Sequence, residues 1–178
     1  MMKTQFADEV LSLRADKDSF LRNDMDSPIP PSDRSSFKGL NYFPPDEGYR
    51  VTSKLERFDS PKHVSIATST GTRQTYLRYG AFTFEVKGQT VKLIVYKSAE
   101  DPYARGLFLP FSDETSGNGT YAAGRYLDLE ERGGDDYELD FNMAYNPYCA
   151  YSEDYTCPIP PVENRLPIKI LAGEKNYK

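Results

Sequence analysis

The sequence predicts a mainly β protein: an antiparallel β-barrel or β-sandwich of about nine short strands with an N-terminal amphipathic helix. Three observations support this fold class. Apolar residues recur at helical spacing near the N-terminus, whereas later segments alternate apolar and polar residues, which is the period of a strand. The 13 prolines and 12 glycines are spread along the chain and favour frequent turns over long helices. These patterns do not distinguish a barrel from a sandwich.

The length of 178 residues suits one domain with a hydrophobic core. Aromatic residues make up 13% of the chain and include no Trp, so Tyr and Phe must supply the large rings of that core. We therefore expect a single domain over residues 1–178. It divides into an N-terminal helix (1–26), an extended arm (27–48) and a β body (49–178).

The N-terminal segment mixes apolar residues with charges in the pattern of an amphipathic helix, which is expected to lie on the outside of the fold. The helix ends before the run SPIPP, because consecutive prolines cannot continue it. Aromatic residues of the following arm are expected to fasten that arm to the body. The apolar residues of the helical pattern are Phe6, Val10, Leu13, Phe20 and Leu21.

The β body begins with an alternating segment at 49–56. The clearest hairpin joins strands 81–87 and 90–97 through Gly88, because glycine readily adopts the positive φ of a tight turn. The side chains expected to be buried in this hairpin are Phe82, Phe84, Val91 and Val95. Further strands are expected around Val64 and Ile66, at 107–111 with Pro110 at an edge or bulge, and at 121–129, 137–142 and 167–171.

The charge distribution argues against several classes of partner. The net charge is −5, and the basic residues of the stretch 61–110 are spaced as the solvent-facing sides of strands, so no nucleic acid is expected. The hydrophobic part of the N-terminus is interrupted by charges, and no apolar run approaches the roughly 20 residues of a membrane span. These features predict a cytoplasmic protein without a membrane partner.

The stretch 121–165 holds the residues with the clearest potential for chemistry. If the glycine pair at 133–134 makes the flanking strands neighbours, Asp128, Asp140 and Asn142 share one face. Paired carboxylates divide acid and base roles when their environments separate their pKa values. The alternative interpretation is the solvent-facing side of an antiparallel strand pair.

Tyrosines and amides follow at the turn Tyr145-Asn146-Pro147-Tyr148. An aromatic ring beside an amide suits sugars or planar ligands, but amides also satisfy the hydroxyls of buried tyrosines. Strand alternation places the side chains of Arg125 and Asp128 on opposite faces of their strand unless a bulge intervenes. With that reservation, the residues expected to converge on one cleft are Arg125, Tyr126, Asp128, Asp140, Asn142, Tyr145, Asn146 and Glu163.

Cys149 and Cys157 do not have the spacing of a metal site. Zinc would need two more ligands, whereas the only histidine, His63, is distant in sequence and no C-x-x-C pair occurs. A catalytic thiol would have to use the same histidine as its base. The residues therefore favour two structural thiols or a small loop-closing disulfide, and they predict no catalytic cysteine, no metal and no cofactor.

Four segments carry a resemblance over nearly the whole chain: SPIPPSDRSSFKGLNYFPPDEGYRV, LFLPFSDETSG, TYAAGRYLD and LDFNMAYNPYCAYSEDYTCPIPPVENRLPIKILAGEK. With them the chain resembles an uncharacterised family of bacterial and archaeal proteins, domain of unknown function sixteen-eighty-four. That family usually has Gly where Ala122 stands here, which is a small change. The resemblance implies one full-length domain and carries no assigned activity.

The favoured function is the binding of a small polar or aromatic ligand in a site walled by residues 121–165. One alternative is a carboxylate-based hydrolase that uses Asp128, Asp140 or Glu163, with Arg125 holding an anionic or carbonyl group. Another is a protein-interaction module with a Tyr-rich surface. The sequence identifies neither the ligand nor the oligomeric state.

Overall fold

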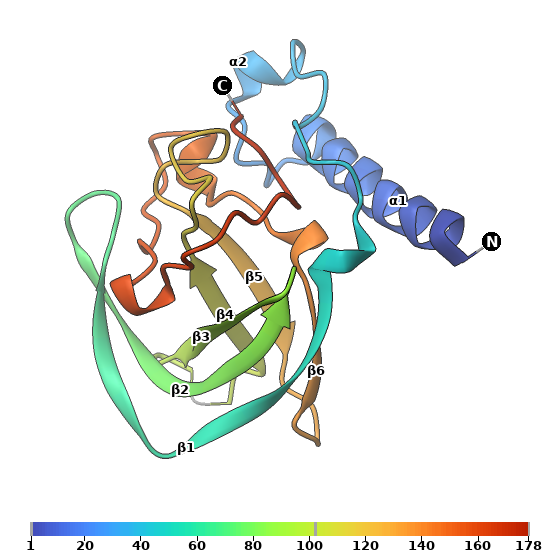
Figure 1. The fold of residues 1–178 in the computed structure, drawn as a ribbon. Coiled ribbons are helices and arrows are strands. Elements are labelled where there is room, and N and C mark those ends of the chain that lie inside the picture. The colour runs from blue at the N-terminus through green and yellow to red at the C-terminus, as the bar shows by residue number, and fades with distance from the viewer. Residues whose placement is uncertain (1, 102, 178) are drawn as a thin grey trace.

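A computed structural model describes residues 2–101 and 103–177. Six strands in these residues form an antiparallel sheet that curls into a nearly closed barrel (Figure 1). The strand order is β5-β4-β3-β2-β1-β6, and the two edge strands, β5 and β6, approach each other where the barrel nearly closes. The strands are β1 (Arg50–Ala67), β2 (Arg73–Val86), β3 (Gln89–Ser98), β4 (Gly106–Phe111), β5 (Arg125–Glu130) and β6 (Asp136–Asp140). The helices are α1 (Met2–Asn23) and α2 (Pro31–Arg34), with short 3-10 turns η1 (Glu47–Tyr49), η2 (Phe141–Met143), η3 (Tyr148–Ala150) and η4 (Val162–Asn164).

The prediction of a mainly β fold with an N-terminal helix is confirmed, but the expected number of strands is too high. The segments at 49–56 and 64–66 belong to one long strand, β1. Its pairing with β2 shifts register between Arg57 and Lys62, and Pro61 lies inside that irregularity. A proline at such a position removes no hydrogen bond from the ladder, so the strand continues through it.

The hairpin formed by β2 and β3 is confirmed. Lys87 and Gly88 form its two-residue turn with φ values of 50° and 75°. Two successive positive φ angles match the right-handed twist of the flanking strands, which is why this turn type closes tight hairpins. All four side chains expected to be buried are less than a tenth exposed: Phe82, Phe84, Val91 and Val95.

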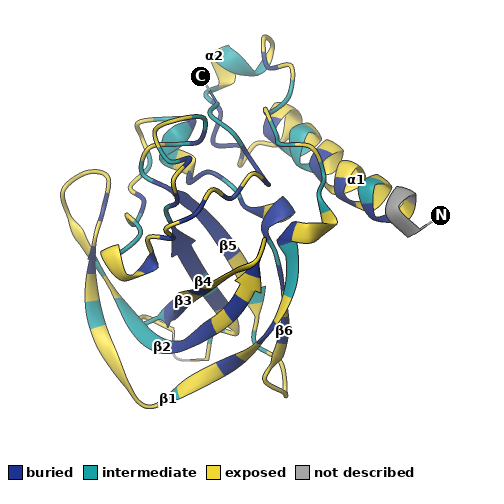
Figure 2. Ribbon diagram, in the orientation of Figure 1, coloured by how far each residue is buried: buried dark blue, intermediate teal, exposed yellow. Residues whose placement is uncertain are grey.

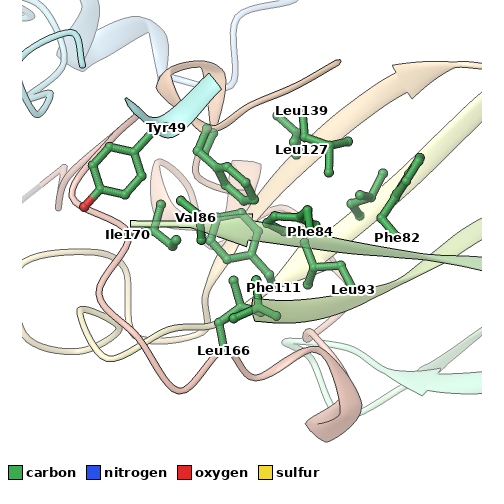
Figure 3. Packing of buried hydrophobic residues seen from close by; sticks show 14 of the residues in the cluster. Tyr49, Phe82, Phe84, Val86, Leu93, Phe111, Leu127, Leu139, Leu166 and Ile170 are labelled. Atoms are coloured by element: carbon green, nitrogen blue, oxygen red, sulfur yellow. The ribbon is translucent and has the colours of Figure 1, made fainter. Parts of the chain in front are cut away.

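The barrel interior is filled by apolar side chains (Figure 3). Aromatic rings pack there at steep angles, as Phe111 and Phe141 do with centroids 5.4 Å apart and planes at 88°. Edge-to-face contacts of this kind add to the burial of apolar area. The labelled members of this core are Tyr49, Phe82, Phe84, Val86, Leu93, Phe111, Leu127, Leu139, Leu166 and Ile170. Because side chains occupy the interior, the clefts described below lie on the outside of the barrel.

Helix α1 lies outside the sheet at one end of the barrel (Figure 1). Figure 2 shows buried residues recurring along it between exposed ones, and the buried apolar residues are Phe6, Val10 and Leu21. Leu13 of the helical pattern is 44% exposed, whereas its neighbour Arg14 is buried. No helix in the described residues is long and apolar enough to cross a membrane.

Arg14 fastens the arm to the helix. Its Nη1 donates to the Phe43 carbonyl at 2.8 Å, and its guanidinium lies 4.4 Å from the centre of the Tyr42 ring. A second nitrogen, Nη2, donates to the Asn142 carbonyl at 3.2 Å, just after β6. The arm is therefore held between α1 and the barrel, as the aromatic residues of the sequence suggested.

The C-terminal segment, residues 166–177, replaces the strand expected at 167–171. It contains bends and joins no sheet, although Ile168 and Ile170 are buried. Its polar backbone groups bond to the loop after β4: the Glu114 amide donates to the Ile168 carbonyl at 2.9 Å, and the Ile170 amide donates to the Asp113 carboxylate at 2.9 Å. A segment that buries alternate residues thus has the sequence pattern of a strand without belonging to one.

Asn164 explains how Pro110 is tolerated in β4. The Asn164 amide accepts from the Ile94 backbone at 2.7 Å and donates to the carbonyls of Ile94 at 2.9 Å and Pro110 at 2.8 Å. This side chain takes the place of ladder bonds between β3 and β4, where the proline has no N–H to offer. The expected irregularity at Pro110 is thus present, although β4 is an inner strand.

Candidate functional site

A cleft of about 510 Å³ lies between α1, β5 and the segment 145–157, on the outside of the barrel. This volume falls within the roughly 300–1,000 Å³ of small-molecule sites in proteins. Its lining is mostly aromatic and apolar, with one carboxylate and one lysine. The lining residues are Lys17, Phe20 and Leu21 of α1, Tyr126 and Asp128 of β5, and Tyr145, Pro147, Tyr148, Tyr155, Thr156 and Cys157.

Strand alternation and a short backbone bridge position three of these residues. In β5, Arg125 and Leu127 point into the barrel, so Tyr126 and Asp128 point out into the cleft. The amide of Tyr126 donates to the Tyr145 carbonyl at 2.8 Å, and the Tyr145 amide donates back at 3.0 Å. This pairing places the two rings edge to face, with centroids 5.7 Å apart and planes at 89°.

Asp128 carries the unusual chemistry of the cleft. Its carboxylate accepts a hydrogen bond from the Tyr145 hydroxyl, and it forms no ion pair with the residues that the structure describes. Asp128 as a residue is exposed, but its carboxylate is partly buried against the concave wall. This burial raises the pKa of Asp128, and the Tyr145 hydrogen bond and the Lys17 charge offset the effect only in part.

Lys17 is neutralised by another group. Its Nζ pairs with Glu174, whose side chain is 1% exposed, and lies 4.8 Å from the centre of the Tyr145 ring. Glu174 also accepts from the Asn146 amide at 2.8 Å and from the Tyr151 hydroxyl at 2.6 Å. The ion pair of Lys17 is therefore with the buried Glu174, and the carboxylate of Asp128 has no ion-pair partner among the described residues.

Similarity to known proteins places the chain in a family. Residues 35–175 match the family described as "Protein of unknown function (DUF1684)". The chain belongs to DUF1684. The resemblance seen in its sequence is thereby confirmed. No curated protein matches the chain.

A solved structure supports the fold of this DUF1684 chain. It is the solution NMR structure of an uncharacterized protein from Haloarcula marismortui, with 38% sequence identity and a TM-score of 0.73. The match covers 97% of the present chain and 95% of the archaeal one. The two proteins therefore share this fold along nearly their whole length. Neither the description of the family nor that of the archaeal protein names an activity.

Arg125 of this DUF1684 protein lies inside the barrel and does not reach the cleft. Its side chain is 1% exposed and pairs with Asp113 at 2.9 Å. It also donates to the carbonyls of Ile170 at 2.9 Å, Glu174 at 3.1 Å and Ala172. Arg125 thus holds the C-terminal segment against the barrel, and these contacts occupy its Nη1 and Nη2 groups.

Asp140 and Asn142 also lie away from Asp128. The expectation of a shared face is wrong, because β5 and β6 occupy opposite edges of the sheet and are not joined as a hairpin. Asp140 pairs with Arg50 at 2.8 Å and accepts from the Asn142 amide at 2.9 Å, which caps η2. The Asn142 side chain bonds both backbone groups of Asp46 at 2.9 Å and so fixes the end of the arm.

The remaining two candidates have separate surroundings. Asn146 is fully buried and donates to the Lys175 carbonyl at 2.9 Å, behind the cleft wall. Glu163 binds Arg78 at 2.8 Å and accepts from the Tyr96 hydroxyl. Burial opposes ionisation of Glu163, but these partners outweigh it and lower its pKa. Of the eight predicted residues, the structure brings Tyr126, Asp128 and Tyr145 together in the cleft.

The two cysteines are adjacent free thiols at the cleft wall. Cys157 lines the cleft, and its Sγ accepts from the Cys149 amide at 3.3 Å. A hydrogen bond from the Cys157 thiol, assisted by Tyr121 and Ser69, lowers the pKa of Cys149 to about 6, while the pKa of Cys157 is raised. In the residues that are described, no group of three or more His, Cys, Asp or Glu side chains is arranged to hold a metal ion.

Sequence reasoning missed the contribution of α1. Lys17, Phe20 and Leu21 lie on one side of the helix because residues three and four apart share a face. The apolar pair was recognised as part of the helical pattern, but nothing in the sequence links it to Tyr145 more than 120 residues later. The clue available in the sequence was a lysine inside an otherwise apolar helical face.

Proposed function

We propose that the protein binds a small molecule in the cleft between α1, β5 and the segment 145–157. The observation that carries the proposal is the carboxylate of Asp128, which has no ion-pair partner among the described residues and lies on a concave, largely aromatic wall. A cleft with apolar walls and a few convergent polar groups is the usual form of a ligand site.

The energetics of Asp128 support a functional role. Partial burial raises the pKa of Asp128 in the folded protein, so the fold disfavours the ionised form of this acid relative to the unfolded chain. A carboxylate that has a raised pKa, lies in a cleft and forms no ion pair is typical of a binding or catalytic site.

The two alternative functions receive less support from the same residues. A carboxylate-based hydrolase would need Arg125, Asp140 or Glu163 near Asp128, but each of these is engaged elsewhere in an ion pair. An interaction surface of tyrosines would be flat and exposed, whereas Tyr126 and Tyr145 line a hollow.

A blocking variant tests the proposal. Thr156 is exposed at the cleft wall, so Thr156→Trp places a large ring in the cleft without touching the core. A fragment library is screened by ligand-observed NMR against the parent, Thr156→Trp and the control Thr90→Trp, whose site is exposed beside the β2–β3 turn. Fragments that bind through the cleft should bind the parent and the control and lose binding to Thr156→Trp. If no fragment shows this pattern, the proposal is wrong.

A further inference from the structure

The charges around the cleft favour a positively charged ligand. Among the lining residues, Lys17 is the one basic side chain, and its charge is paired with Glu174. The second carboxylate oxygen of Asp128, Oδ1, makes no hydrogen bond to the described residues and remains free to accept one. An anion in this cleft would meet an unpaired carboxylate and no free cation, whereas a cation would meet its counter-ion.

The aromatic walls favour the same kind of ligand. Tyr126 and Tyr145 stand at 89° to each other, and Tyr148 and Tyr155 stand at 78°. Perpendicular ring pairs turn their faces in different directions and so line adjoining sides of the hollow. Ring faces carry negative electrostatic potential and attract ammonium groups within about 6 Å.

The hydroxyls of the first ring pair add to this preference. Tyr126 donates its hydroxyl proton to the Pro158 carbonyl, and Tyr145 donates its own to Asp128. Both phenolic oxygens therefore retain only accepting capacity. An incoming N–H donor suits such a wall, and an acceptor-rich ligand does not.

Lys17 provides a precedent within the molecule. Its ammonium group already lies 4.8 Å from the centre of the Tyr145 ring, so this wall accommodates an alkylammonium group. The net charge of −5 also draws cations toward the protein as a whole.

From this arrangement we propose that the ligand is a small organic amine, with its ammonium group on the Asp128 carboxylate and its body against the tyrosine rings. This inference rests on the proposed function and specifies its ligand class. The test uses three probes of the same size that differ in charge: 2-phenylethylamine, 2-phenylethanol and phenylacetate.

Each probe is titrated into the parent protein at pH 7, and binding is followed by the NMR shifts of residues that line the cleft. The amine should bind about tenfold or more tightly than the alcohol, because only the amine makes a charge-assisted hydrogen bond to Asp128. Phenylacetate should bind more weakly still. This charge series needs no variant and so does not depend on any substitution being tolerated.

Two variants then test whether the carboxylate of Asp128 causes the preference for the amine. Asp128→Asn should remove the preference for the amine over the alcohol. Glu130→Gln removes the same charge two residues along β5, where the side chain is exposed outside the cleft, and should leave the preference intact. If the amine preference survives in Asp128→Asn or falls equally in both variants, the inference is overturned.

The outcomes separate the two proposals. If the alcohol or phenylacetate occupies the cleft as tightly as the amine, the amine class is wrong and small-molecule binding stands. If neither the three probes nor any library fragment shifts the cleft residues, the proposed function fails and the amine inference fails with it.

Discussion

Replacing Asp113 by Asn tests how strongly one buried ion pair holds the barrel together. The Asp113 and Arg125 side chains are 0% and 1% exposed. Four donors surround the Asp113 carboxylate: Oδ1 accepts from the amide and the hydroxyl of Thr115, and Oδ2 accepts from Arg125 and the Ile170 amide. An Asn side chain has one acceptor oxygen, so its NH₂ group faces donors in either orientation.

The expected loss is large. Leaving a buried charge without its partner costs about 3–5 kcal/mol, against a total stability of about 5–15 kcal/mol for a typical protein. For a chain of this size each kcal/mol lowers Tm by about 2–4 °C, so Asp113→Asn should lower it by about 6–20 °C. Arg125→Met should cost at least as much, because three carbonyls of the C-terminal segment also lose their donor.

Urea and thermal unfolding followed by circular dichroism measure these losses. Glu114→Gln is the matched control, since Glu114 is exposed and adjacent to Asp113. An NMR spectrum of each variant at low temperature establishes that it is folded before unfolding begins. A loss below about 1 kcal/mol for Asp113→Asn would refute the reasoning, because that is the size of an ordinary surface change.

Three other predictions concern single positions. Gly88→Val should destabilise by about 1–2 kcal/mol, since a β-branched residue is strained at φ 75°, whereas Gly133→Val should be nearly neutral in the same urea assay. Cys149 should be alkylated by iodoacetamide faster than Cys157 at pH 7, with a rate that falls as pH drops through about 6; mass spectrometry of the modified thiols checks this. Asp128→Asn should raise the free energy of unfolding at pH 7, and the gain should shrink as pH falls through the raised pKa of Asp128, because the parent's acid then becomes as uncharged as the Asn; a higher stability of the parent at pH 7 would contradict this.

Local patterns predicted the elements whose partners are close in sequence. The β2–β3 hairpin follows from alternation on both sides of Gly88, and its pairing needs no distant information. The N-terminal helix follows in the same way from a period of 3.6. The strand count was too high because the long strand β1 was expected as two strands and because the C-terminal segment alternates without joining a sheet.

The candidate site depended on contacts that local patterns do not contain. Alternation correctly separated Arg125 from Asp128, but the turn at 133–134 wrongly suggested that β5 and β6 are a hairpin. The closing strand β6 pairs instead with β1, about 85 residues earlier in the chain. Asp140 and Asn142 were therefore grouped with Asp128, and their roles in capping η2 and fixing the arm could not be seen.

The position of α1 has a consequence for how the molecule assembles and opens. The helix shares no sheet hydrogen bonds, and Lys17 meets its buried partner Glu174 across 157 residues of sequence. Contacts between the two ends of a chain close the longest loops and tend to form late in folding. The cleft should thus be completed last, after the barrel has formed. For the same reason the helix can detach while the sheet stays intact, and amide hydrogens of α1 should exchange with solvent well before those of β2 and β3.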